Sequence, residues 1–327
     1  MPTPDNVDPN SCILNCDAGK PAPTQAPAPT GNQAPPSGQQ QSATDRVTSD
    51  STEGRTRTRA IEDLFECDPN AAPDQAVNAG LLSGGIPGPG TTKQGSMGDC
   101  WVLASFMGFQ VSEAGRAALA KLVTANPNGG YDVRFGSDCR MFHVDKVFAD
   151  GARQVNGSTG SKDQGVISVL EAAFRQTSTP AKYQMCAGWF APEAQKVITG
   201  TFSEEYPDLS PMGHKMRDRL TKDADDVNSL IASGRSAVVS TRKDTSFITD
   251  VMTPSGLKSS TKVKLVGQHQ YVVTKAAQDG VWIMNPWGPN NSGDGGGEVW
   301  VPVAQIEDSF SDFAISAPIP DVSGKSC

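Results

Sequence analysis

Residues 94–105 read Gln-Gly-Ser-Met-Gly-Asp-Cys-Trp-Val-Leu-Ala-Ser, and this stretch decides how the chain is interpreted. Its glycines permit a tight turn before Cys100, Asp99 is a good N-cap residue, and the apolar run that follows predicts a helix over 101–109. A thiol at a helix N-terminus ionises more readily, because the helix dipole favours negative charge there. A free cysteine is more often a buried core residue, but the polar, glycine-rich side of this segment favours a nucleophile at Cys100.

The chain has three histidines, so the search for a general base is short. His143 lies in an alternating, strand-like segment and His214 lies at a predicted helix start, and both are interpreted as structural or surface residues. His269 directly precedes an apolar strand predicted over 271–275, which lets its ring project from the strand end into a cleft. His269 is therefore the predicted acid/base.

Asn285 ends the next predicted strand, 281–284, after one β-turn. Antiparallel pairing of these neighbouring strands would bring His269 and Asn285 side by side. An amide oxygen facing the imidazole N–H would fix the ring's tautomer and orientation, the third role in a Cys-His-Asn arrangement. Trp287 is expected to cover that hydrogen bond. Gln94 is the predicted oxyanion donor, beside the backbone N–H of Cys100.

The composition and charge of the chain limit the kinds of molecule that it is expected to bind. The 327-residue chain has 37% hydrophobic residues, a net charge of −8 and a pI near 5.0. Phosphate binding needs clustered Lys and Arg, so nucleic acid and anionic membrane surfaces are disfavoured. No stretch reaches the ~20 apolar residues of a membrane span, and no signal peptide is recognised at the N-terminus. The compartment and the oligomeric state stay open, with the cytoplasm favoured.

The seven cysteines match no zinc-binding spacing, and setting Cys100 aside leaves six that are able to form disulfides.

Three regions are predicted along the chain. Residues 1–58 are Pro- and Gln-rich and are expected to form a disordered tail. Residues 59–205 are expected to form a helical lobe that carries Cys100, and residues 206–327 a β-rich lobe that carries His269 and Asn285. The predicted fold is α+β, with two lobes and a cleft between them. Helices are expected over 113–123, 166–175, 192–199 and 215–231, a hairpin over 131–135 and 141–148, and further strands over 236–241, 261–266 and 298–301.

Three segments resemble one known family. QGSMGDCWVLAS, QHQYVVT and MNPWG are similar to the nucleophile, histidine and asparagine segments of the calpain family of papain-like cysteine peptidases, and the similarity extends over residues 61–317. The resemblance implies a papain-like fold and hydrolysis of peptide bonds inside protein substrates through a thioester. It implies Cys100 as nucleophile, His269 as acid/base, Asn285 as orienting residue and Gln94 as oxyanion donor. Gly98 and Trp287 are the expected substrate-binding residues.

Two positions depart from the family pattern. Gln268 stands where the family usually has glycine, directly before the histidine. A glycine-rich segment, GDGGGE, follows NPWG where the family has a tryptophan-containing one. These departures concern the details of the cleft more than the type of reaction.

Calcium is the one cofactor that the sequence leaves open. A twelve-residue calcium loop starting at Asn290 is rejected, because Val301 replaces the glutamate required at its last position. The acidic residues Asp99, Asp294 and Glu298 remain available as ligands, although such carboxylates are more often solvated.

Two other functions compete with a peptidase. A transglutaminase-like acyl transferase also uses a Cys-Trp at a helix start and a later histidine, but its third residue is usually Asp. The other alternative is a catalytically silent, calpain-like binding module that uses the Pro/Gln-rich tail as an adaptor. The complete set of Gln94, Cys100, His269 and Asn285 argues against the silent module.

Overall fold

The computed structural model describes part of the chain. The predicted tail over 1–58, His214 and Asp294 lie outside it. The described residues are 68, 70–137, 140–155, 161–178, 184–186, 188–207, 215–253, 256–288 and 297–322.

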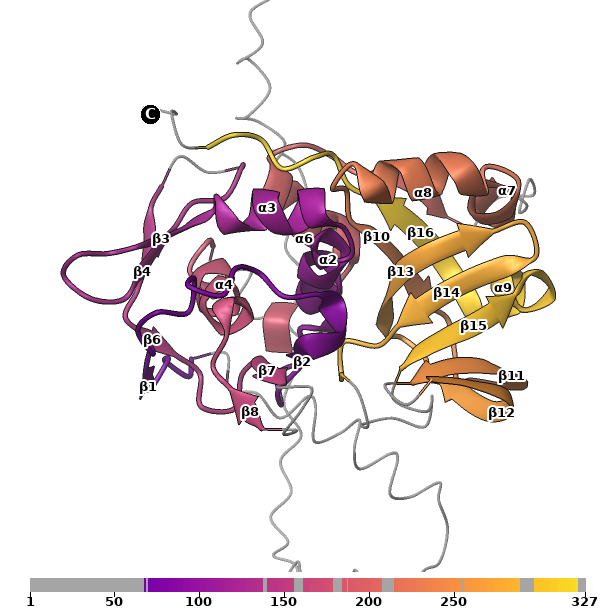
Figure 1. Ribbon diagram of the computed structural model, residues 1–327, viewed down its shortest axis with the longest axis horizontal. Helices are drawn as coiled ribbons and strands as arrows, with labels where there is room; N and C mark the ends of the chain where they lie inside the picture. The colour runs from indigo at the N-terminus through magenta and orange to yellow at the C-terminus, as the bar shows by residue number, and fades with distance from the viewer. Residues whose placement is uncertain are drawn as a thin grey trace, which may run out of the picture. The chain divides into compact units, whose positions relative to one another are not determined.

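Helices dominate the first half, as predicted (Figure 1). The helix that begins at the predicted nucleophile is confirmed as α2, and its eleven residues are all buried. Burial on every side is expected of a helix whose residues are apolar all round. The helices and the 3-10 turn of this half are η1 (Pro89–Thr91), α2 (Cys100–Gln110), α3 (Glu113–Ala120), α4 (Val166–Arg175) and α6 (Ala191–Thr199).

α3 ends before the predicted boundary at residue 123. Val123 instead begins a strand that pairs with Val133, so the predicted hairpin gains a third strand. A β-branched residue favours such a position over a helix end. The short strands of this half form sheets β3-β4-β5, β2-β7-β8 and β1-β6, with bounds β1 (Gln75–Ala76), β2 (Thr92–Lys93), β3 (Val123–Ala125), β4 (Tyr131–Val133), β5 (Phe142–Val144), β6 (Lys146–Val147), β7 (Arg153–Val155) and β8 (Lys162–Asp163).

An aromatic cluster fills the core of this half. Trp101 of α2 and Phe174 of α4 meet edge to face with ring centroids 5.5 Å apart, and Phe106 and Phe135 lie beside them. All four side chains are at most 1% exposed. This packing fixes α2 against α4 and so fixes the position of the first turn of α2.

The second half is built on an eight-stranded antiparallel sheet with the order β12-β11-β15-β14-β13-β10-β16-β9. The mixture of helices and antiparallel sheet confirms the α+β class. The predicted strands over 236–241, 271–275, 281–284 and 298–301 are present. The sheet strands are β9 (Glu204–Pro207), β10 (Ala237–Thr241), β11 (Thr245–Thr253), β12 (Gly256–Leu265), β13 (Gln270–Ala277), β14 (Gly280–Met284), β15 (Glu298–Pro302) and β16 (Phe310–Ile315).

Three features of this half differ from the prediction. The helix predicted over 215–231 is two helices, α7 (Lys215–Thr221) and α8 (Ala224–Ala232), because a turn at residues 222–223 closes back onto the carbonyl of Asp218. β11 was not predicted, since its sequence TSFITDVMT groups polar residues in pairs and apolar residues in pairs and so lacks the strict alternation of a half-buried strand. β12 is longer than the predicted 261–266. A last helix, α9 (Val303–Ser309), precedes β16.

The two halves meet where α2 packs on β10 and β13 (Figure 1). Ala104, Met107, Val238 and Val272 form a small buried cluster at this junction. The Ser236 hydroxyl donates to the carbonyl of Ser105 at 2.8 Å. β9 begins at Glu204 and belongs to the large sheet, and Val322 packs into the core of the first half.

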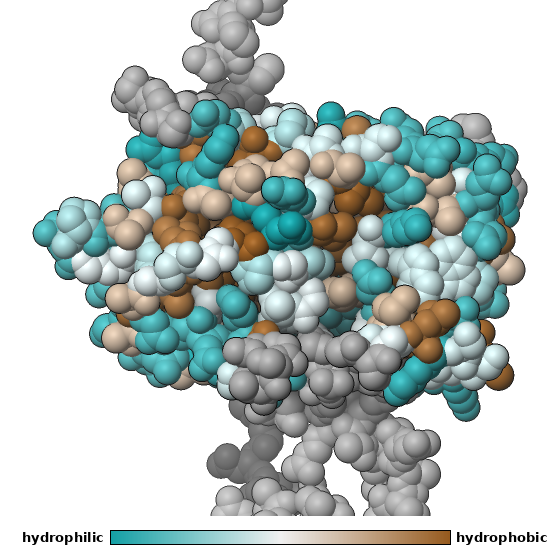
Figure 2. All heavy atoms as spheres, viewed as in Figure 1, coloured by the Kyte–Doolittle hydropathy of each residue, from teal (hydrophilic) through white to brown (hydrophobic). Residues whose placement is uncertain are grey.

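Most of the described surface in Figure 2 is hydrophilic, and brown side chains also appear where β11 and β12 lie in Figure 1. The exposed apolar residues of this hairpin are Ile248, Met252 and Leu257. No helix among the described residues is long and apolar enough to cross a bilayer.

Candidate active site

Cys100 is the first residue of α2, as predicted, and its side chain is buried. The backbones of Gln270 and Trp101, together with that of Cys100 itself, favour the ionised form of the thiol. Gln270 directly follows His269, so the thiol lies against the start of β13. Burial raises the pKa of the Cys100 thiol to about 12, the backbone hydrogen bonds oppose that rise, and the nearby charge of Asp99 adds to it.

His269 and Asn285 are side by side, as their spacing predicts. β13 and β14 pair in antiparallel register with Val272 opposite Met284, so the residues just outside the pair meet at one end. His269 Nε2 lies 2.9 Å from Asn285 Oδ1. Because an amide oxygen only accepts, Nε2 is the protonated nitrogen of a neutral His269, and Nδ1 is left as the basic one.

Burial also determines the charge of the ring. It lowers the pKa of His269 to about 4, against the opposing effect of the Asn285 hydrogen bond. With the thiol pKa raised and the imidazole pKa lowered, the resting site holds a neutral thiol and a neutral imidazole at pH 7.

Two aromatic rings hold the imidazole in place. Trp287 is tilted over His269 with centroids 4.8 Å apart, and Tyr271 meets the ring edge to face at 5.1 Å. The backbone N–H of Trp287 also donates to Asn285 Oδ1, at 3.0 Å. Trp287 therefore both covers the His269–Asn285 pair and helps to orient the Asn285 amide.

Specific contacts set the backbone conformation around His269. Gln268 has a φ of +53°, in the left-handed region that favours glycine. A glycine would adopt this backbone conformation at lower cost than glutamine. Thr241, which the sequence did not single out, accepts the His269 N–H on its hydroxyl at 3.0 Å and donates its own N–H to the His269 carbonyl at 2.9 Å. A threonine ending a buried strand gives no signal of such a role.

Gln94 lies at the site but faces inward. Its amide nitrogen donates to the Met97 carbonyl at 2.6 Å and to Asp99 Oδ1 at 3.2 Å, so both amide hydrogens are engaged. Its backbone N–H donates to the carbonyl of Pro286 at 2.8 Å and so links the nucleophile loop to the Asn285 segment. Gly95 is essential to this loop, because a Cβ there would lie 1.8 Å from the carbonyl oxygen of Asp150. Gly98 is buried in the same turn.

Asp99 occupies the N-cap position of α2, as predicted, but its side chain makes no capping hydrogen bond. It points instead toward Gln94 and Glu171 of α4 and is fully buried. Glu171 was not among the predicted site residues. The signal available in the sequence was a single carboxylate inside the otherwise apolar helix VISVLEAAF.

One further histidine and one further cysteine lie within the described residues. His143 is exposed and pairs with Asp132 at 2.9 Å, in keeping with its interpretation as a surface residue. Cys186 is disulfide-bonded, whereas Cys100 is a free cysteine.

In the part of the chain that the structure describes, no group of three or more His, Cys, Asp or Glu side chains is arranged to hold a metal ion. The carboxyl group of Asp99 is already engaged by Gln94 and Glu171. Glu298 lies at the start of β15, in another part of the chain. No chemical step is therefore derived through calcium.

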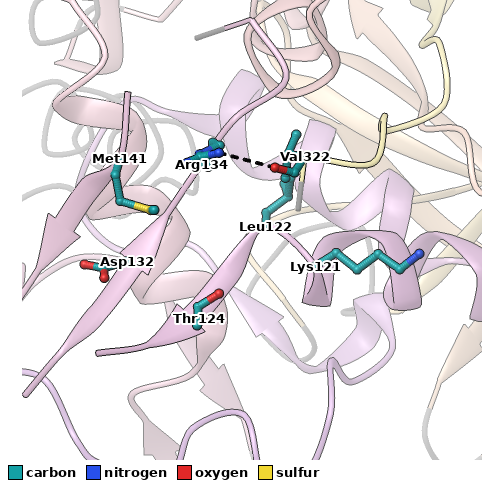
Figure 3. Close-up of a pocket in the computed structure, with 7 residues that line it drawn as sticks. All are labelled: Lys121, Leu122, Thr124, Asp132, Arg134, Met141 and Val322. Carbon is teal, nitrogen blue, oxygen red and sulfur yellow. Dashed lines mark hydrogen bonds between the residues drawn. The ribbon is translucent and has the colours of Figure 1, made fainter. Parts of the chain in front are cut away.

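A pocket of about 190 Å³ lies elsewhere, beside β3 and β4, and Figure 3 shows Arg134 donating to the Val322 carbonyl across it. None of the predicted site residues lines it. Its lining residues are Lys121, Leu122, Thr124, Asp132, Arg134, Met141 and Val322.

Comparison with protein families gives a match to the calpain family cysteine proteases over residues 81–301. That range includes the nucleophile loop, His269 and Asn285. A comparison with curated proteins found no match. Since the matched range covers more than half of the chain, the chain belongs to the calpain family of cysteine proteases.

Proposed function

We propose that this protein is a cysteine endopeptidase that hydrolyses peptide bonds in protein substrates. Cys100 is the nucleophile, His269 the acid/base and Asn285 the orienting residue. The observation that carries the proposal is the 2.9 Å hydrogen bond between His269 Nε2 and Asn285 Oδ1, beside the start of β13, the strand on which α2 packs with Cys100 as its first residue. That hydrogen bond leaves Nδ1 free to take a proton.

The proposed architecture is the two-lobed arrangement of papain-like peptidases. It is supported by two separate hydrophobic cores, one containing Trp101 and Phe174 and the other Tyr271 and Phe313, with α2 packed between them on β10 and β13. The proposed lobes are residues 59–205 and 206–327, and substrate would lie between them, beside Gly98 and Trp287.

The reaction begins from the neutral pair. His269 Nδ1 takes the thiol proton as the Cys100 sulfur attacks the substrate carbonyl carbon, so a thiolate does not have to accumulate beforehand. The tetrahedral intermediate collapses when His269 gives that proton to the leaving amine, which leaves a thioester on Cys100. Water then attacks the thioester with His269 as base, and the acid product leaves with the thiol restored.

The oxyanion is stabilised by the backbone N–H of Cys100, which lies in the first turn of α2, and by the amide of Gln94. In this proposal Gln94 gives up one of its inward hydrogen bonds, to Met97 or Asp99, when substrate binds. The free-energy cost of that exchange is small when the oxyanion replaces the neutral carbonyl of Met97 as acceptor, because a hydrogen bond to a charged group is stronger than one to a neutral group.

The test is turnover of an unstructured protein substrate such as casein, together with mass-spectrometric mapping of an epoxide that labels reactive thiols. Cys100→Ala is expected to abolish both cleavage and labelling at this position, while Cys100→Ser retains the fold and loses at least 1000-fold in kcat, roughly the contribution of an activated nucleophile. Equal turnover by Cys100→Ala would overturn the proposal. Incorporation of an amine into glutamine side chains without cleavage would favour the acyl transferase instead.

A further inference from the structure

A buried pair of carboxyl groups lies directly behind the nucleophile. Asp99 precedes Cys100 at the start of α2, and Glu171 lies in the middle of α4. Both are 0% exposed. Two buried carboxyl groups side by side cannot both stay ionised without a large cost, because like charges repel and neither is solvated. We therefore expect Asp99 and Glu171 to share one proton.

The contacts of Glu171 fix its carboxyl group in place. Both of its oxygens lie 2.9 Å from the backbone N–H of Ala152. Arg175, one turn further along α4, adds a positive charge that acts on both Glu171 and Asp99, and it donates to the carbonyl of Asp68 at 2.7 Å and to the sulfur of Met97. Glu171 is thus held by the loop before β7 and by its own helix.

The protonation of the pair follows from burial. Burial raises the pKa of Asp99 to about 7, while a hydrogen bond from Glu171 opposes that rise. Burial raises the pKa of Glu171 well above its ordinary value, and the charge of Asp99 raises it further. At neutral pH Glu171 is therefore the protonated member, and Asp99 is the member that titrates.

Asp99 connects this pair to the active site in two ways. Its Oδ1 accepts one of the two amide hydrogens of Gln94. Its charge raises the pKa of the Cys100 thiol. Gln94 Oε1 and Asp99 Oδ2 are buried and have no partner at ordinary hydrogen-bond length among the described residues.

We propose that Glu171 is a positioning residue that acts through Asp99. In its protonated form it donates to the Asp99 carboxylate, and Asp99 in turn orients the Gln94 amide and sets the charge beside the Cys100 sulfur. The role of Gln94 in this proposal rests on the proposed peptidase function. The effect on the thiol does not, because a thiol can be titrated without turnover.

The groups that face the pair come from each element around it. They are Gln94 and Met97 from the loop, Cys100 from α2, Arg175 from α4, and the more distant charges Asp68, Asp150 and Arg153. Within the pair, Asp99 is the group whose pKa is raised to about 7. When Asp99 loses its proton near pH 7, the new negative charge opposes formation of the thiolate. The rate of thiol alkylation should therefore rise less steeply with pH around 7 than it does for an isolated thiol.

The test is the rate of iodoacetamide alkylation at Cys100 between pH 5 and 9, followed on the peptide that contains Cys100 so that other cysteines do not interfere. The full chain is used, as wild type and as Asp99→Asn, Glu171→Gln and Glu171→Leu. The control is Glu113→Gln, an exposed residue in the first turn of α3. For the wild type and the control, we expect a pH range near 7 in which the alkylation rate rises less steeply with pH. This range is called the shallow region below.

Three outcomes are expected. Asp99→Asn loses the shallow region and is alkylated about tenfold faster at pH 8, the effect of about one pKa unit on the thiolate fraction. Glu171→Gln keeps the shallow region, since the glutamine amide also donates to Asp99. Glu171→Leu removes that donor, moves the shallow region to higher pH by about one unit, and lowers kcat for peptide cleavage more than it raises KM.

A wild-type profile without the shallow region, or an Asp99→Asn profile that keeps it, would overturn the proposal. So would loss of the shallow region in Glu171→Gln, because that would mean Glu171 acts as an anion. If Glu171→Leu does not fold, the Asp99→Asn and Glu171→Gln profiles still decide. If the thiol profiles are as expected but no variant cleaves protein, the peptidase function fails and the role of the pair stands.

Discussion

Asn285 Oδ1 lies 2.9 Å from Nε2 of His269 and also accepts the backbone N–H of Trp287 at 3.0 Å. One amide oxygen thus orients the imidazole and is itself oriented by the next turn of the chain. A histidine held in this way presents Nδ1 to its surroundings in a fixed direction, which is what a general base next to a cysteine requires.

Replacing Asn285 with alanine should lower kcat by 10²- to 10⁴-fold, about the usual contribution of general acid–base catalysis, because the neutral imidazole would no longer be held in one tautomer and orientation. Asn285→Gln keeps an amide but shifts its oxygen, and should give an intermediate loss. Steady-state hydrolysis of a peptide substrate measures both. Turnover by Asn285→Ala within twofold of wild type would contradict the orienting role.

Trp287 should matter through its ring and not through its indole N–H, since Nε1 is buried and makes no hydrogen bond to a described residue. Trp287→Phe keeps an aromatic face over His269 and should remain close to wild type. Trp287→Ala exposes the hydrogen bond between His269 and Asn285 to water and loosens the ring, and should cost on the order of 10²-fold in kcat/KM. Equal effects of the two substitutions would argue against this covering role.

His269 should make stability depend on pH in a defined window. Its pKa in the folded protein, about 4, lies below the ordinary value of 6.5, so the unfolded chain takes up the proton first as pH falls. The stability due to neutral His269 is therefore fully present above pH 6.5 and is lost as the pH falls toward 4, by on the order of 3 kcal/mol.

The free energy of unfolding of wild type and His269→Asn, measured by urea denaturation from pH 7.5 to 4, checks this directly. The wild-type advantage should shrink as the pH falls. A wild-type advantage over His269→Asn that stays constant across the range would show that the ring is not held neutral.

Gln268 carries backbone strain that a glycine would relieve. At a φ of +53°, a side chain costs about 1 kcal/mol, partly offset by the greater freedom of glycine in the unfolded chain. Gln268→Gly should therefore leave stability unchanged or raise it by less than ~1 kcal/mol, whereas the β-branched Gln268→Val should lower it by 1–3 kcal/mol. Thermal denaturation separates the two, and a stable Gln268→Val would contradict the strained geometry.

Local signals in the sequence were enough to place the main parts of the site. The glycine-rich turn and the apolar run predict a helix start at Cys100, and the turn between two apolar strands predicts that His269 and Asn285 meet. Both features depend on short stretches of chain, where propensity and hydrogen-bond pattern act directly. The split of 215–231 into α7 and α8 was not predicted. Neither were β11 and the first part of β12, whose polar composition does not separate a strand from a loop.

The orientation of side chains in the interior was not predictable in the same way. Asp99 is a good N-cap residue by type, and the sequence places it correctly at the start of α2. Its carboxyl nevertheless turns away from the helix, because Glu171 and Gln94 approach it from other parts of the chain. An isolated α2 would contain neither partner.

The sequence by itself therefore determined the α+β class, the helix that begins at Cys100 and the pairing that brings His269 to Asn285, since each follows from neighbours close along the chain. The tertiary structure alone decided that Gln94 faces inward, that Thr241 holds the backbone of His269, and that Asp99 and Glu171 are buried together. These depend on desolvation and on contacts between residues as far apart as α2 and α4, and burial of charge has no signature in a local stretch of sequence.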